Sequence, residues 1–100
     1  MAIACDLGAF CAGERAEHER LRARLQTAVT ELRELPDGLE FRIAGERLEP
    51  DQLMRWVLLE RLCCPFLGFE IELGPERGPT WLRLRGGPGV KEFLQAEMGR

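Results

Sequence analysis

The chain has 100 residues, 45% of them hydrophobic, which fits one compact domain (residues 1–100) with a modest core. Its 14 basic and 17 acidic residues give a net charge of -3, and because the arginines are interspersed with glutamates, we expect no nucleic-acid partner. No apolar run approaches the roughly 20 residues of a membrane span, and the first 20 residues lack a signal-peptide pattern, so we expect a soluble cytoplasmic protein.

Helical periodicity marks the first long element. Apolar residues fall on one stripe, while charged residues supply most of the remaining surface: the stripe contains Leu21, Leu25, Ala28, Val29 and Leu32. The spacing predicts an amphipathic helix from Gly13 to Leu35.

A turn and a strand follow this helix. The sequence Pro36-Asp37-Gly38 has turn chemistry, and Leu39, Phe41 and Ile43 then alternate with polar or small residues. This alternation predicts a half-buried strand.

A second helix should begin at Pro50, because proline is favoured in the first turn of a helix. It should end at Cys64, because the residue before Pro65 is biased away from helical angles.

The C-terminal third predicts a hairpin and a short helix. In residues 66–73, apolar side chains alternate with glutamates, and in residues 80–86 leucines alternate with arginines, so opposite charges should pair across the strands. Residues 90–98 predict a terminal helix with Val90, Phe93, Leu94 and Met98 facing inward. The resulting order, α-β-α-β-β-α, predicts an α+β fold: a small two-layer sandwich with helices on one face of a three-stranded sheet.

One carboxylate interrupts the apolar face of the second helix. At about 100° per residue, Glu60 falls between Cys63 and Cys64, on the face that also holds Leu53, Trp56 and Val57. Burying an unpaired carboxylate is costly, so Glu60 must find an arginine, a backbone donor, a proton or a metal. If Glu60 has only a structural role, we expect it to form a salt bridge with an arginine. If it has a functional role, we expect it to bind a ligand or to act as an acid or base.

The adjacent Cys63 and Cys64 allow two interpretations. Reduced cysteines pack as small apolar residues, so the pair could simply fill the core. As metal ligands they do not match structural zinc spacing, and the negative end of a helix disfavours thiolates without a cation. Soft ions select thiolate and tolerate irregular geometry, so a soft ion is favoured over zinc.

Two further cysteines and the only histidine lie near the N-terminus. Cys11 stands just before the first helix, where the positive helix end lowers a thiol pKa, and is the best candidate for a reactive thiol. His18 heads the stripe of Leu21 and Leu25, as a surface or boundary residue or as a partner of Cys11. Cys5 lies close to the chain end. The chain has no serine, which excludes a serine hydrolase, and a Cys-His pair lacks a third orienting residue.

The segments "ERLCCPFLGFEIEL" and "WLRLRGGPGVKEFL" together resemble a family of small, largely uncharacterised bacterial proteins. The N-terminal segment "ACDLGAFCAGERAEHERLRAR" is similar too, so the resemblance covers most of the chain. Some such proteins are encoded near mercury- or other metal-resistance functions. The resemblance therefore favours a soft metal over other ions, and it brings no activity with it.

We predict a small thiol protein that binds or transfers a soft metal ion, Hg(II) or Cu(I), with zinc the less favoured ion. The expected ligands are Cys63, Cys64, Cys11 and Cys5, and the residues expected beside them are Glu60 and His18. The expected partner is the metal ion or a metal-transfer protein, a homodimer is compatible with the sequence, and binding is favoured over catalysis. Two alternatives stay open: an interaction or regulatory module with structural cysteines, and a redox sensor that joins Cys11 to one of the pair.

Overall fold

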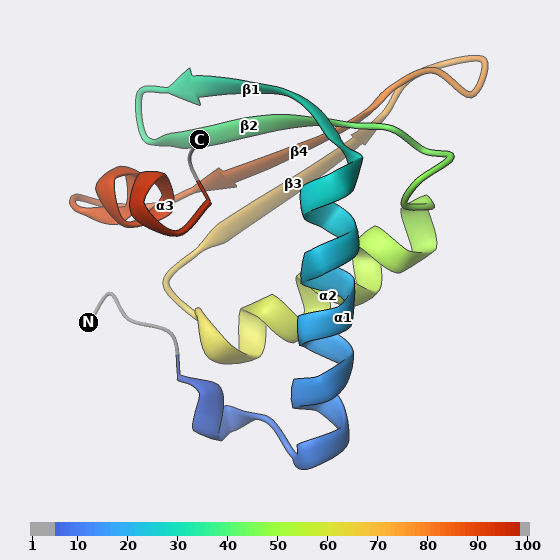
Figure 1. The fold of residues 1–100 in the computed structure, drawn as a ribbon. Coiled ribbons are helices and arrows are strands. Elements are labelled where there is room, and N and C mark those ends of the chain that lie inside the picture. Colours follow the sequence, from blue (N-terminus) through green and yellow to red (C-terminus); the bar gives the residue numbers. More distant parts are fainter. Residues whose placement is uncertain (1–5, 99–100) are drawn as a thin grey trace.

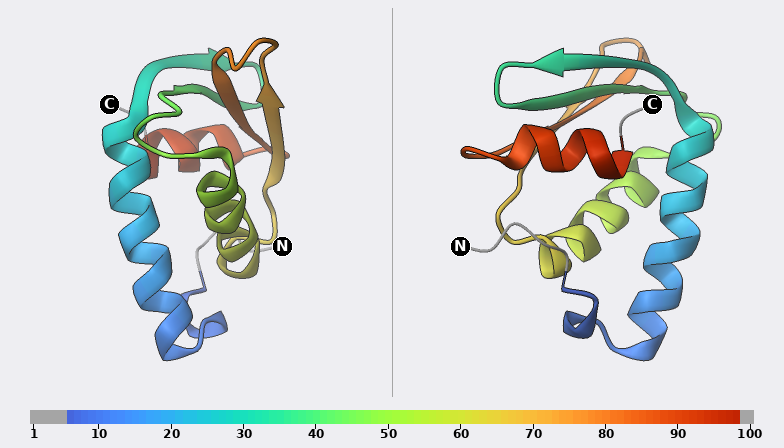
Figure 2. Two further views of the ribbon diagram at one scale, coloured as in Figure 1. Left: turned by 90° about the vertical axis from the view of Figure 1, so that its right-hand side faces the viewer. Right: turned by 60° about the vertical axis from the view of Figure 1, so that its left-hand side comes forward.

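The computed structural model describes residues 6–98 of the chain. Its elements, in chain order, are η1 (Leu7–Ala9), α1 (Ala12–Ala28), β1 (Val29–Leu35), β2 (Gly38–Ile43), α2 (Pro50–Cys63), β3 (Gly68–Leu73), β4 (Thr80–Arg85) and α3 (Val90–Met98) (Figure 1). The strands form one antiparallel sheet in the order β1-β2-β4-β3. The helices lie on the same side of this sheet (Figures 1 and 2).

The prediction of a three-stranded sheet was wrong, because residues 29–35 form strand β1 and not the end of the first helix. The helix ends at Ala28, where the β-branched Val29 and Thr30 follow. A two-residue turn, Pro36-Asp37, then folds β1 back onto β2, with Leu35 opposite Gly38. The apolar spacing of residues 29–35 fitted a helix, but pairing with β2 satisfies the backbone as a strand.

The two faces of the sheet differ in character, as the alternating sequence predicted. Leu39, Phe41 and Ile43 of β2 are buried, and Leu82 and Leu84 of β4 are buried beside them. On the other face, glutamates of β3 pair with arginines of β4: Arg83 donates to Glu72 at 2.7 Å and Arg85 to Glu70 at 2.6 Å. The predicted charge pairing across this hairpin is confirmed. Leu73, the last apolar residue in this alternation, is 60% exposed at the end of β3.

The helices supply the other half of the core. The buried stripe of α1 consists of His18, Leu21, Leu25 and Ala28. Helix α2 begins at Pro50 as predicted and ends at Cys63, one residue earlier than expected, with Cys64 as its C-cap. Of the predicted inward residues of α3, Val90 and Leu94 are buried, and Phe93 and Met98 are partly buried against the core. Within residues 6–98, no helix has the length and apolar character needed to cross a membrane.

Candidate metal centre

The end of α2 gathers one carboxylate and two thiols. Cys63 and Cys64 follow Glu60 by three and four residues. This spacing places the three side chains on one face of the last helical turn. Both thiols donate to the same oxygen of Glu60, with Sγ to Oε1 distances of 3.2 Å for Cys63 and 3.2 Å for Cys64. The two sulfurs lie 3.5 Å apart, well beyond a disulfide bond of about 2.05 Å. The side chains thus form a compact group of reduced thiols around a carboxylate.

Helix α1 adds an imidazole to this group. His18 Nε2 lies 3.4 Å from Glu60 Oε2, whereas the two thiols donate to Oε1. The ring of His18 lies near two aromatic rings, with centroid distances of 4.9 Å to Phe10 and 6.3 Å to Trp56. His18 and Glu60 are only 5% and 7% exposed, so their interaction is shielded from water. We call His18, Glu60, Cys63 and Cys64 the Glu60 cluster.

The Glu60 cluster favours the ionised carboxylate. Burial by itself raises the pKa of Glu60, but hydrogen bonds from His18, Cys64 and Cys63 together outweigh it, and the pKa lies below the usual value. A buried carboxylate without these donors would be expected to take up a proton. The ionised carboxylate therefore lies beside the imidazole of His18 and two sulfurs.

The cluster can offer a metal ion sulfur, nitrogen and oxygen ligands. One ligand atom each of His18, Glu60 and Cys63 lie within 4.8 Å of one another. Cys64 Sγ adjoins this group through its contacts with Cys63 and Glu60. The sulfur separation of 3.5 Å is short enough for both sulfurs to contact one ion at about 2.3 Å, the usual Zn–S distance. The donor set fits a thiophilic ion.

A cavity of about 260 Å³ reaches the cluster. His18, Glu60 and Cys63 line it at the helices, and the remaining wall is mostly apolar, with Leu67 and Phe93 among its members. Sequence reasoning missed this cavity, because its wall combines residues from η1, α1, α2, the segment after α2, and α3. No local pattern marks such a wall.

Cys11 differs from Cys63 and Cys64 in its exposure. Cys11 is exposed at the start of α1 and lines a shallow depression with Phe10 and Arg15, and it is not a member of the group of His18, Glu60 and Cys63. Cys5 lies outside the described residues. The residue after it, Asp6, donates its backbone N–H to the carbonyl of Cys63 at 2.8 Å. Roles for Cys5 and Cys11 at the metal stay predictions.

The predicted position of Glu60 beside Cys63 and Cys64 agrees with the structure, but the predicted partner of its carboxylate does not. An arginine was the expected structural partner, whereas the partners that the described structure gives Glu60 are His18 and the two thiols. His18 lies 42 positions away on another helix, so only the packing of α1 against α2 reveals the contact. The helical stripe shared with Leu21 was the one signal that His18 faces inward.

Comparison with known proteins found no matching family model, no similar curated protein and no similar solved structure. The resemblance to small bacterial proteins described above therefore stays a prediction. The case for a function consequently depends on the chemistry of the Glu60 cluster.

Proposed function

We propose that the protein binds a soft, thiophilic metal ion at the Glu60 cluster. Cys63 and Cys64 would be the principal ligands, because thiolate is the ligand that ions such as Hg(II) and Cu(I) select. His18 and Glu60 would either complete the coordination or hold the thiolates by hydrogen bonds. A reducing cytoplasm would keep both thiols available for the ion.

The observation that carries this proposal is the convergence of His18, Glu60 and Cys63 ligand atoms within 4.8 Å at a cavity wall. Two thiols that only filled the core would need no buried carboxylate beside them. Here one carboxylate contacts both thiols and an imidazole from a second helix. Such a carboxylate is costly to desolvate, and a bound cation would offset that cost.

A binding titration tests the proposal. Hg(II) or Cu(I) is added to the reduced protein, and alkylation of the thiols, ultraviolet thiolate-to-metal absorption and melting temperature are followed. We expect about one ion per chain to protect two thiols and raise the melting temperature, since an ion at 100 times its Kd adds about 2.7 kcal/mol to stability. Cys63→Ala and Cys64→Ala should each weaken binding strongly.

Cys11→Ala provides the matched control, because Cys11 is exposed and outside the cluster. Its binding should equal that of the unmodified protein, and an equal loss would instead support the predicted role of Cys11 as a third ligand. Cys5→Ala tests the remaining predicted ligand in the same way. Titration with Zn(II) in parallel tests the selectivity for soft ions.

Two outcomes would favour the alternatives. If no metal changes the melting temperature and Cys63 and Cys64 react only after unfolding, the pair is structural and the chain is an interaction or regulatory module. If peroxide removes two thiols and a reductant restores them, while metals have no effect, a redox sensor is the better description.

A further inference from the structure

The cavity beside the Glu60 cluster is larger and more apolar than a bare ion requires. Its volume is about 260 Å³, and its apolar wall consists of Leu7, Leu67, Phe93, Leu94 and Met98. An apolar cavity of about 150 Å³ in another protein is large enough to bind benzene. The space beside the thiols could therefore hold an organic group the size of an aromatic ring.

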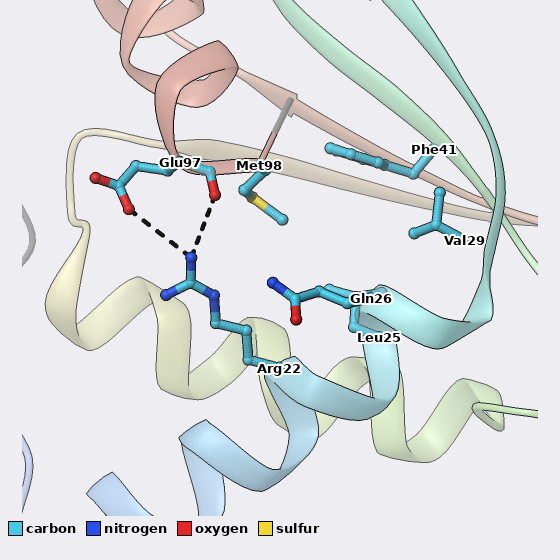
Figure 3. A pocket seen from close by; sticks show the side chains of 7 residues that line it. All are labelled: Arg22, Leu25, Gln26, Val29, Phe41, Glu97 and Met98. Carbon is cyan, nitrogen blue, oxygen red and sulfur yellow. Dashed lines mark hydrogen bonds and ion pairs between the residues drawn. The ribbon is translucent and has the colours of Figure 1, made fainter. Parts of the chain in front are cut away.

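A second pocket of about 240 Å³ lies next to this cavity, and Figure 3 shows its lining. Arg22, Glu97 and Met98 line both spaces, so the two are neighbours under α3. Arg22 donates to the backbone carbonyl of Glu97 at 3.2 Å and pairs with its carboxylate at 3.8 Å (Figure 3). Both of these side chains are substantially exposed, whereas His18 and Glu60, the other polar residues of the cavity wall, are buried in the Glu60 cluster.

We propose that the ligand of this site is a soft metal that carries an organic group, of the type R–Hg⁺, with the metal on sulfur and the group R in the cavity. The inference depends on the proposed metal-binding function and specifies its ligand. Cys63 lines the cavity together with His18 and Glu60, and the five apolar residues of the wall supply a surface for an apolar group. A hydrated inorganic ion would gain nothing from that wall.

The binding step is a ligand exchange without oxidation or reduction. The Cys63 thiol loses its proton to solvent, a sulfur–mercury bond forms, and the water or chloride on mercury leaves. The carbon–mercury bond stays intact. The product, S–Hg–R, has no net charge, which suits a largely apolar cavity. Inorganic Hg(II) would instead need both Cys63 and Cys64 to reach a neutral complex.

Competition against glutathione measures the contribution of R, because glutathione offers the same sulfur without a cavity. Phenylmercury, methylmercury and inorganic Hg(II) are each partitioned between the protein and glutathione, and mercury is quantified in both fractions. Relative to glutathione, we expect phenylmercury to favour the protein at least about tenfold more than methylmercury does, because a ring buries more apolar surface than a methyl group.

Variants that fill the cavity provide the second test. Met98→Trp and Leu7→Trp both add bulk at partly exposed positions of the wall, so at least one should fold normally. Either should reduce the phenyl preference by about tenfold and leave binding of inorganic Hg(II) unchanged. Met54→Trp is the matched control, since Met54 is 46% exposed on α2 and is not part of this wall.

The outcomes distinguish this inference from the proposed function. If inorganic Hg(II) binds at Cys63 and Cys64 but phenylmercury shows no preference over methylmercury, the organic ligand is refuted and the metal site stands. If phenylmercury binds equally well to Cys63→Ala/Cys64→Ala, its site lies elsewhere and the inference fails. If the protein retains none of the three mercury compounds in competition with glutathione, and the Cu(I) titration is also negative, both proposals fail.

Discussion

Glu60 on α2 lies 3.4 Å from His18 on α1, and both side chains are buried. This contact joins the two helices at the candidate site. Replacing Glu60 by glutamine keeps the shape but removes the charge that His18 and the thiols stabilise. We expect Glu60→Gln to lower the free energy of unfolding by about 1–3 kcal/mol, the range for a buried hydrogen-bonded group, as measured by urea denaturation.

Glu19→Gln is the control for this substitution, because Glu19 is 70% exposed in an ion pair with Arg15. Its effect should stay within about 0.5 kcal/mol. A double-mutant cycle with His18→Ala then isolates the pair, and the two effects should not add, because each removes the same contact. Additive effects would show that His18 and Glu60 stabilise the protein independently.

Acid should destabilise the protein partly through Glu60. The pKa of this carboxyl is lower in the folded protein than its usual 4.5, so the folded state binds the proton less readily than the unfolded state does. The stabilisation is therefore fully present above about pH 4.5 and is lost as pH falls through the lower, folded-state pKa. The stability difference between the unmodified protein and Glu60→Gln should narrow over that acidic range. A difference that stays constant between pH 7 and pH 3 would argue against an ionised Glu60.

Much of the fold followed from local patterns, and the parts that did not share one cause. The burial of Leu39, Phe41 and Ile43 and the charge pairing of the β3–β4 hairpin are properties of alternating sequence, so the sequence predicted them. β1 was misassigned because Val29 and Leu32 satisfy a helical stripe as well as a strand. Only the partner strand β2 decides between the two conformations.

The candidate site shows the same division between local and distant contacts. Glu60, Cys63 and Cys64 belong to one helical turn, so their grouping could be predicted from spacing. The partnership with His18, the exposure of Cys11 and the cavity depend on how η1, α1 and α3 pack around α2. Sequence periodicity contains no information on that packing.

The cysteines should differ in reactivity. Cys11 is exposed, whereas Cys63 and Cys64 are 0% and 1% exposed. In a Cys5→Ala background, a small disulfide reagent should label Cys11 fastest and the other two thiols more slowly, because they are buried. Mass spectrometry after peptide digestion assigns the order. Equal rates for the three thiols would contradict the burial of the pair.

Trp56 offers an optical reporter of the site, because its indole ring stacks on His18 with 6.3 Å between ring centroids. Trp81, the other tryptophan, lies on β4 near Arg33 and Arg42, so Trp81→Phe leaves Trp56 as the sole emitter. Since a heavy atom quenches nearby fluorescence, Hg(II) bound at the cluster should quench Trp56 in a saturable way. The same titration on Cys63→Ala/Cys64→Ala should give only weak, unsaturable quenching. Identical curves for the two proteins would place the bound mercury away from Trp56.

A substitution at Gly38 can test the position of β2 between β1 and β4, which the sequence analysis did not predict. It opens β2 between β1 and β4, and a Cβ atom there would lie only 1.8 Å from the backbone oxygen of Leu84. Because backbone atoms cannot move aside without shifting a strand, Gly38→Ala should lower the free energy of unfolding by about 1–3 kcal/mol. Gly45→Ala is the matched control, since a Cβ at Gly45 meets nothing within 4 Å, and its effect should stay within about 0.5 kcal/mol. Thermal or urea unfolding measures both. If Gly38→Ala were as stable as Gly45→Ala, β2 and β4 could not lie in this register.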